Sequence, residues 1–266
     1  MGLAVPTTAF TCNIADGLAH IVLNQPERGN PIDGAFARDF SLCIAELSER
    51  ADVRAVLISS QGRLFSVGGD LGALGGAGDN LPVTIKSWTA DLHSGIARMV
   101  RMRAPVVIAV HGNIAGGSIS LMAAADVIVF ARSARVTSAF ARIGFTPDSG
   151  TTWTVTARMG WARTKRFFLL AETLDADAAL AAGLVDKVVD DAAVLTEAET
   201  IARTLAAGPT EAYGGIKRLF LQAAGRSIES QLEEEAQTLA ATSKTRDARE
   251  GIAAFREKRQ PRFTGQ

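Results

Sequence analysis

Cysteine and histidine are scarce in this chain of 266 residues, and their scarcity excludes several kinds of site. The chain has two cysteines, Cys12 and Cys43, which cannot build a zinc site by themselves. Three histidines lie far apart in sequence, without the close helical spacing of metal ligands: His20, His93 and His111. We therefore expect no metal. Two isolated thiols are typical of small buried residues in a reducing compartment, which predicts a cytoplasmic protein.

An excess of charge of one sign is also missing. Lysine plus arginine and aspartate plus glutamate both number 28, so the formal net charge is +0. This balance gives no field that would attract nucleic acid. No apolar run approaches the roughly 18 residues of a membrane span. The best candidate, "LMAAADVIVFA", is short and is interrupted by Asp126. The 47% of hydrophobic residues suffices instead for one substantial core with a smaller appended element.

Strand-like and helical patterns alternate over the first half of the chain. "AFTCNIADGLAHIVLNQP" predicts two strands joined at Asp16-Gly17. "DGAFARDFSLCIAELSER" has a helical period with Asp33 as N-cap, and one face carries Ala37, Phe40, Ile44 and Leu47. "VRAVLISS", "APVVIAVHG" and "DVIVFA" read as buried strands between helices. This order indicates an α/β fold with crossover connections.

The second half of the chain has a different pattern of predicted secondary structure. From about Thr151 onward the pattern predicts helix almost throughout, ending in a charged amphipathic tail that packs on its own domain or on a neighbouring subunit. Before it, "GRLFSVGGDLGALGGAGDN" predicts a glycine-rich loop that is mobile in its second half.

Two glycine-rich segments follow strands and are candidates for a ligand site. They are Ser66–Asp70 and Gly116-Gly117-Ser118. Glycine lets the backbone approach a ligand and direct N–H groups at it. Two such segments can form an oxyanion hole around one oxygen atom. Gly-Gly pairs are also typical of ordinary turns. Neither segment matches a nucleotide-binding fingerprint or a GxSxG elbow, so a nucleotide cofactor or a serine hydrolase is not indicated.

Four stretches together resemble one known family. "LFSVGGDL", "APVVIAVHGNIAGGSISLMAAADVIVFA", "FARIGFTPDSGTTWTVTARMG" and "REGIAAFREKRQPRF" are similar, in this order, to the enoyl-CoA hydratase/isomerase family, the crotonase superfamily. The resemblance implies a ClpP-like spiral of ββα units over residues 1–205. It also implies a helical region over 206–266 that forms trimers or dimers of trimers and contacts coenzyme A. The substrate would be an acyl-CoA thioester, with no other cofactor.

The resemblance also assigns residues. It places the two oxyanion N–H groups at Gly69 and Gly117, with Val67 beside the substrate. Arg28 lies where family members contact the nucleotide end of coenzyme A. Phe255 and Lys258 match positions that reach coenzyme A from the terminal helix, often on a neighbouring subunit. The residues alone are also consistent with Arg28 as an ordinary exposed arginine. They are likewise consistent with Phe255 and Lys258 as part of an amphipathic helix with solvated charges.

The acid and base groups separate the branches of this family. Hydratases resemble one another in using two glutamates, and this chain has Ser120 and Phe140 at those positions. Adding water calls for water activation and proton delivery, which these residues do not supply in the ordinary way. Asp148 resembles the acid/base aspartate of the isomerase-like branch. Apolar neighbours Phe140, Ile143 and Phe145 are expected to desolvate it and raise its pKa. Without the resemblance, "PDSG" is typical of a helix N-cap.

We therefore favour an enoyl-CoA double-bond isomerase, such as those of fatty acid metabolism, over three alternative functions. His93 resembles in position the histidine of 4-chlorobenzoyl-CoA dehalogenases, although Phe140 stands where they carry tryptophan. A dehalogenase or thioester hydrolase using Asp148, a hydratase with unusual groups, and a catalytically silent acyl-CoA-binding subunit are the alternatives. We expect His93 to be a pocket wall or a structural helix residue, and Asp70 to cap the turn after the first glycine segment.

Overall fold

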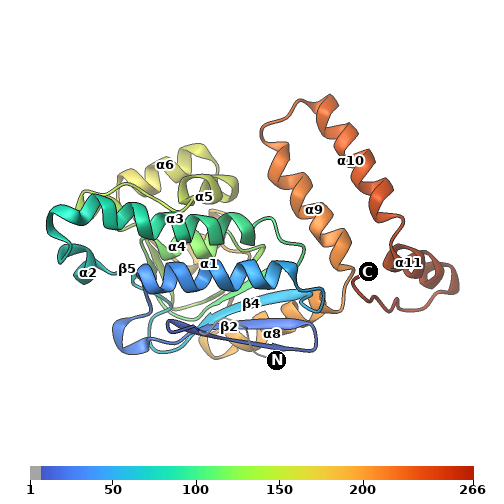
Figure 1. The fold of residues 1–266 in the computed structure, drawn as a ribbon, viewed down its shortest axis with the longest axis horizontal. Helices are drawn as coiled ribbons and strands as arrows, with labels where there is room; N and C mark the ends of the chain where they lie inside the picture. The colour runs from blue at the N-terminus through green and yellow to red at the C-terminus, as the bar shows by residue number, and fades with distance from the viewer. Residues whose placement is uncertain (1–6) are drawn as a thin grey trace.

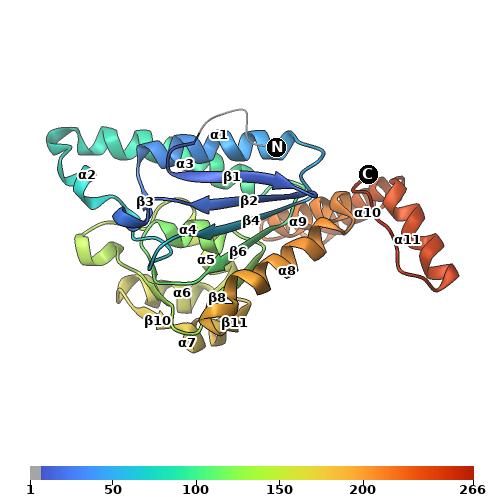
Figure 2. The same ribbon diagram turned by 90° about the horizontal axis from the view of Figure 1, so that it is seen from below.

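The largest sheet of the protein has six strands in the order β1-β2-β4-β6-β8-β11. A computed structural model describes residues 7–266, so residues 1–6 of the predicted core domain lie outside the described part. β1 runs antiparallel to β2, and each later neighbour is parallel. Figure 2 shows these strands side by side. Their bounds are Phe10–Ala15 (β1), Leu18–Leu23 (β2), Ala55–Ser60 (β4), Val106–Val110 (β6), Val127–Ala131 (β8) and Lys187–Val189 (β11).

Two smaller sheets deliver the glycine-rich segments. One pairs β3 with β5, and the other has the order β10-β9-β7. A single bridge from Ser66 to Ile114 connects the two segments. Segments far apart in sequence are thereby brought together. The bounds are Pro31–Ile32 (β3), Gly68–Gly69 (β5), Ile114–Ala115 (β7), Arg135–Thr137 (β9) and Thr173–Asp175 (β10).

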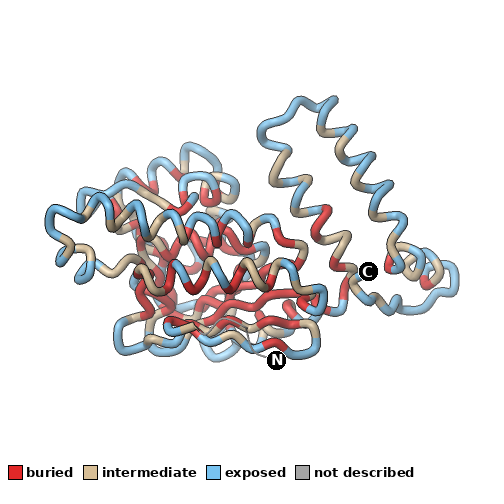
Figure 3. The backbone as a smooth tube through the Cα atoms, viewed as in Figure 1, coloured by how far each residue is buried: buried red, intermediate tan, exposed pale blue. Residues whose placement is uncertain are grey.

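Helices cover both faces of the main sheet. α1 (Gly34–Glu49) and α3 (Leu81–Met99) pack on each other along one face. α8 (Val194–Ala206) lies on the opposite face, against β4, β6 and β8 (Figures 1 and 2). The predicted N-cap of α1 is confirmed, since Asp33 Oδ1 accepts the N–H of Phe36 at 3.0 Å. The predicted apolar face of α1 is also buried in full. The buried residues concentrate between these layers (Figure 3).

Short helices connect the sheets. They are α2 (Leu71–Gly75), α4 (Ser118–Ala123), α5 (Thr151–Met159), α6 (Trp161–Leu169) and α7 (Ala176–Ala181). Single 3-10 turns complete the connections: η1 (Pro26–Arg28), η2 (Gly78–Asn80), η3 (Phe140–Ile143) and η4 (Asp191–Ala193). The predicted hairpin is confirmed as well. Asp16 and Gly17 have φ angles of 50° and 79°, the left-handed pair that a tight turn between twisted strands requires.

The C-terminal helices stand apart from the sheet. α9 (Thr210–Ala223) packs on α10 (Ile228–Thr242), and α11 (Arg246–Glu257) follows. Figure 1 shows them at the opposite end of the molecule from α2, and Figure 3 shows them largely exposed. The domain boundary near residue 205 stays a prediction. Within residues 7–266, no helix combines the length and apolar character that a membrane crossing requires.

One expectation about secondary structure is incomplete and another is wrong. β10 and β11 lie in the region predicted to be almost wholly helical, because strands of three residues are too short to show a period of two. In the glycine-rich stretch, residues 71–80 form α2 and η2 instead of an open loop. Asp70 caps α2 there, with its Oδ1 accepting the N–H of Ala73 at 2.9 Å. A good cap offsets the poor helix propensity of the glycines.

Candidate active site

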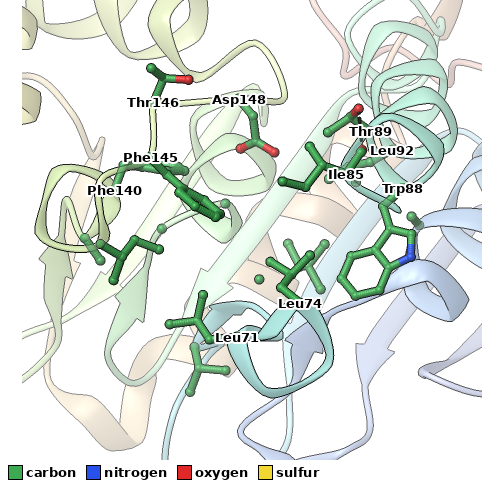
Figure 4. Close-up of a pocket in the computed structure, with 18 of the residues that line it drawn as sticks. Leu71, Leu74, Ile85, Trp88, Thr89, Leu92, Phe140, Phe145, Thr146 and Asp148 are labelled. Carbon is green, nitrogen blue, oxygen red and sulfur yellow. Dashed lines mark hydrogen bonds between the residues drawn. The ribbon is translucent and has the colours of Figure 1, made fainter. Parts of the chain in front are cut away.

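A cavity of about 430 Å³ opens where the two glycine segments meet α2, α3 and η3. Five of the predicted catalytic and substrate-binding residues line it: Val67, Gly69, Gly117, Phe140 and Asp148. Most of the remaining wall is apolar. It comes from α2, α3, η3 and the loop after η3. It includes Leu71, Leu74, Ile85, Trp88, Leu92 and Phe145 (Figure 4), together with Ile143 of η3. The cavity is therefore suited to an apolar chain that carries one polar reacting end.

The N–H of Gly69, in β5, faces away from the neighbouring strand β3. β5 pairs in parallel with β3, and the N–H of Asp70 donates to Ile32 O at 3.2 Å. Successive N–H groups of a strand point to alternate sides. The N–H of Gly69 therefore points away from β3, on the side where Gly117 lies.

Gly117 closes this side of the cavity. It is the N-cap residue of α4, where backbone N–H groups lack a partner within the helix. A methyl group built on Gly117 would lie 3.9 Å from Gly69 N and 3.6 Å from Asp148 Oδ1. Two main-chain amides and one carboxylate thus surround a single small volume. This is the arrangement that an oxyanion hole next to an acid/base group needs.

Gly68 shows how tightly the two segments fit. Its φ of +84° is left-handed, and an added Cβ would lie 2.4 Å from Ala115 O and 3.1 Å from Gly117 N. No side chain can be placed there without moving backbone. The spacing of the amides is consequently set by main chain packed against main chain, for which glycine is required.

Asp148 presents a carboxylate that is not used for capping. The N-cap of α5 is Gly150, and no side chain caps this helix. Thr151 bonds instead to the main-chain oxygen of Asp148. Asp148 Oδ1 is buried without a hydrogen-bond partner in the described structure. Figure 4 shows the carboxylate between the loop that carries Phe145 and helix α3 with Ile85. The alternative that the carboxylate is a helix cap is therefore wrong.

Burial changes the acidity of Asp148. Desolvation is the largest influence on its pKa and raises it above the ordinary value for aspartate. Burial penalises the ionised form, which makes the carboxylate a stronger base. The predicted rise is thus confirmed in direction, and the cavity wall of Phe140, Ile143 and Phe145 is also as expected.

His93 does not line this cavity. Its Nε2 accepts the N–H of Ser149 at 3.0 Å, from behind the Asp148 turn. Ser149 has a φ of 53° and Gly150 a φ of 75°, so two consecutive residues are left-handed. His93 instead borders a second cavity of about 440 Å³, together with Trp153 and other residues. Its contact supports the turn and does not reach the reacting volume.

The two positions that carry glutamate in hydratases have no acid function here. The Ser120 hydroxyl donates to Gly117 O at 2.6 Å and is buried inside α4. Phe140 forms part of the apolar cavity wall. Among the described residues that line the cavity, Asp148 is the single ionisable side chain.

The predicted coenzyme A contacts lie elsewhere. Arg28, in η1, forms ion pairs with Asp33 and Asp70. Phe255 is 85% exposed on α11, at the end of the molecule opposite α2 (Figure 1). Lys258 follows α11 as its left-handed C-cap. None of the three predicted contacts lines the cavity, and their roles toward coenzyme A stay predictions.

The sequence analysis missed a buried residue that shapes the site. Asn30, 3% exposed, donates from Nδ2 to the carbonyl oxygens of Gln61, Leu64 and Phe65. Its own carbonyl oxygen accepts the hydroxyl of Ser66 at 2.7 Å. The available signal was an asparagine before Pro31, since asparagine tolerates the left-handed φ of 52° found here. Asn30 fixes the chain that leads to Gly69.

Comparison with known proteins agrees with this geometry. A family model described as enoyl-CoA hydratase/isomerase matches residues 13–266. The chain belongs to this family. A probable enoyl-CoA hydratase of Rhodobacter capsulatus is 34% identical over 252 residues, covering 95% of this chain and 96% of that protein. The 1,2-epoxyphenylacetyl-CoA isomerase of Escherichia coli is 31% identical over 257 residues, covering 95% and 97%.

Solved structures confirm the predicted fold class. An enoyl-CoA hydratase from a Polaromonas species has a TM-score of 0.91 at 26% identity, covering 97% of this chain and 100% of that chain. The protein therefore has the crotonase fold, and it belongs to a family that acts on acyl-CoA thioesters. Relatives named hydratase and relatives named isomerase both match, so names alone do not choose between the two reactions.

Proposed function

We propose that this member of the enoyl-CoA hydratase/isomerase family is an enoyl-CoA double-bond isomerase with Asp148 as its single acid/base. The observation that carries the proposal is the lone ionisable side chain of the cavity, beside two convergent amides. A shift of a double bond needs one group that takes and returns a proton. Hydration ordinarily needs two positioned groups.

The first step removes a proton from C2 of a 3-enoyl thioester. The thioester oxygen accepts the N–H groups of Gly69 and Gly117, and the ionised Asp148 takes the C2 proton. The electrons of the C–H bond form a C1=C2 bond, and negative charge moves to the oxygen. Two fixed amides stabilise this dienolate, and one such donor typically contributes ~10²–10³ in rate.

The second step returns the proton two carbons away. The dienolate oxygen gives back its electrons, a C2=C3 bond forms, and C4 takes the proton from the neutral Asp148. The carboxylate is regenerated, and the product is the 2-enoyl thioester. No bond to water forms, and no electron leaves the substrate. The reaction therefore requires no metal or redox cofactor, and coenzyme A enters as part of the substrate.

The competing reactions have weaker support in the same site. A hydratase would need groups at Ser120 and Phe140, but that hydroxyl is bonded to Gly117 O and the phenyl ring has no proton to give. A dehalogenase or hydrolase would need a base for water, and His93 stands behind the turn instead of in the cavity. A silent binding subunit differs from all of these in having no turnover.

We further propose that the protein assembles as a trimer or a dimer of trimers in the cytoplasm. Large apolar side chains on the C-terminal helices support assembly, since isolated helices rarely leave so many in water. The exposed set includes Ile216, Phe220, Ile228, Leu232, Leu239, Ile252 and Phe255. Two free cysteines are consistent with a reducing compartment.

A comparison of two substrates tests the proposed reaction. Purified protein is given a 3-enoyl-CoA and, separately, crotonyl-CoA, and formation or loss of the conjugated 2-enoyl thioester is followed by ultraviolet absorbance. We expect isomerisation of the first and hydration of the second at least about 100-fold slower, because water has no base dedicated to it. Comparable or faster hydration would reject the isomerase. Binding without turnover across a panel of thioesters would favour the silent subunit.

A further inference from the structure

Arg28 is engaged in a cluster that leads directly to the oxyanion hole. Its Nη2 donates to Asp33 Oδ2 at 2.8 Å and to Asp70 Oδ2 at 2.6 Å. Its Nη1 donates to Gln25 Oε1 at 2.8 Å. The guanidinium therefore joins η1 to the first residue after Gly69. Two carboxylates that lie 37 positions apart in sequence, from 33 to 70, share one nitrogen atom.

Both carboxylates are also helix caps, so the cluster is fixed on each side. The second oxygen of Asp33 accepts the N–H of Phe36 at the start of α1. The second oxygen of Asp70 accepts the N–H of Ala73 at the start of α2. Arg28 thereby ties the starts of two helices together across the pair of strands β3 and β5.

Asn30 holds the other end of the same loop. Its side-chain amide donates to three carbonyl oxygens within residues 61–65, upstream of Gly69. Arg28 holds Asp70, downstream of Gly69. The loop that presents the amide of Gly69 is thus anchored on both sides by one short stretch of chain, residues 28–30.

The charge of the cluster opposes the binding of a phosphate at Arg28. One guanidinium faces two carboxylates, which gives a net charge of −1 when all three are ionised. The N–H of Ala73, and after it Arg28, hold the pKa of Asp70 below its usual value, so Asp70 is ionised at neutral pH. A phosphate group would approach a cluster that is already negative, and it would compete for donors that are already used.

We propose that Arg28 is a positioning residue of the oxyanion hole, which acts through Asp70 to hold the amide of Gly69 in line. This inference rests on the proposed function, because it concerns the step that places negative charge on the thioester oxygen. It differs from a nucleotide contact in one measurable respect. A positioning role affects the rate with any thioester, whereas a nucleotide contact affects only substrates that have the nucleotide.

The test compares full and truncated substrates. Arg28→Met removes the charge and keeps a long side chain, and Arg38→Met makes the same change at an exposed arginine on α1. Each variant is assayed with a 3-enoyl-CoA and with the matching N-acetylcysteamine thioester, which lacks the nucleotide. For Arg28→Met we expect kcat to fall about 10- to 100-fold on both substrates, because small misplacements of a catalytic donor cost this much. Arg38→Met should match the wild type.

A second variant checks that the effect passes through Asp70. Asp70→Asn keeps an oxygen for Ala73 and removes the ion pair with Arg28. We expect a similar loss of kcat, and no further loss in the double variant, because both changes break the ion pair between Arg28 and Asp70 through which the proposed effect passes. Additive losses would overturn the proposal. So would an Arg28→Met effect confined to KM for the coenzyme A thioester.

A readout without turnover separates this inference from the proposed function. Amide hydrogen exchange of residues 64–74 is measured by mass spectrometry in the free proteins. Exchange should be faster in Arg28→Met than in the wild type and in Arg38→Met, because the loop loses its downstream anchor. Unchanged exchange would overturn the positioning role even if isomerisation is observed. Faster exchange in a protein that fails to isomerise 3-enoyl thioesters would reject the proposed reaction alone.

Discussion

The two sides of the cavity are built in different ways. On the amide side, main chain packs against main chain, and Gly68 has no room for a side chain. On the acid side, Asp148 sits on a turn with two consecutive left-handed residues, supported by His93 and Thr151. The first side is fixed by many contacts and the second by few. Under the proposed function, the amides that would hold the thioester oxygen are fixed by the packing of the fold, whereas the proposed acid/base group lies on a loop.

The rigidity of the amide side is tested by Gly68→Ala. The new Cβ would lie 2.4 Å from Ala115 O on a backbone with φ of +84°, so backbone must move. We expect kcat to fall about 100-fold or more and the free energy of unfolding to drop by about 2–4 kcal/mol. Steady-state kinetics and urea unfolding measure the two effects.

Gly75→Ala is the matched control, because a Cβ on Gly75, at the end of α2, would meet nothing within 4 Å. It should leave both quantities near the wild-type values. Full activity in Gly68→Ala would show that the two glycine segments adapt easily, and the contrast between the two sides would be lost.

The weaker support of the acid side is tested at His93. His93→Leu removes the acceptor for the N–H of Ser149, whereas His93→Gln retains an acceptor. We expect the leucine variant to lose about tenfold in kcat, with a smaller change in KM, because the carboxylate shifts while the binding wall stays. The glutamine variant should recover most of that loss. Equal losses in both would instead indicate that the imidazole itself takes part in the chemistry.

The pH dependence of kcat/KM reports on the Asp148 side of the cavity alone, and so separates it from the amide side. In the proposed reaction the ionised Asp148 is the base, and burial raises its pKa. The acidic limb of kcat/KM should therefore lie above the ordinary aspartate value of about 4, with activity falling as pH decreases through it. A limb at or below that value would show that the site does not desolvate Asp148.

The same pKa shift should lower the stability of the folded protein as pH rises, whereas it is activity that increases with pH. The folded-state pKa of Asp148 lies above its unfolded value, so its favourable contribution is complete below the unfolded pKa and is lost as pH rises through the folded pKa. Asp148→Asn should therefore melt above the wild type at neutral pH, and the two should converge in acid. Thermal unfolding across pH measures this difference.

Local signals in the sequence were sufficient for much of the fold. Asp33 caps the helix that its position indicates, and Asp16-Gly17 forms its turn, because each depends on nearby residues only. β10 and β11 could not be read in this way. Their pairing partners β9 and β8 lie about 35 to 60 residues upstream, and strands this short have no pattern of their own.

The site shows the same limit. Asp148 and the two glycines could be found from motifs, yet the role of Asn30 depends on carbonyl groups more than 30 positions away. The ion pair between Arg28 and Asp70 is equally non-local. His93 was expected to be a pocket wall or a structural helix residue; it does not line the substrate cavity, and its contact with Ser149 N–H agrees with the second expectation. Contacts made by tertiary packing leave no periodic trace in the sequence.

One variant tests the role of the lone carboxylate most directly. Asp148→Asn keeps the shape of the side chain and removes the base, so isomerisation of a 3-enoyl-CoA should slow at least about 10³-fold. Its affinity for a saturated acyl-CoA, measured by calorimetry, should remain close to that of the wild type, because the amides and the apolar wall are unchanged. Isomerisation within tenfold of the wild-type rate would contradict the account, since no other ionisable side chain among the described residues lines the cavity.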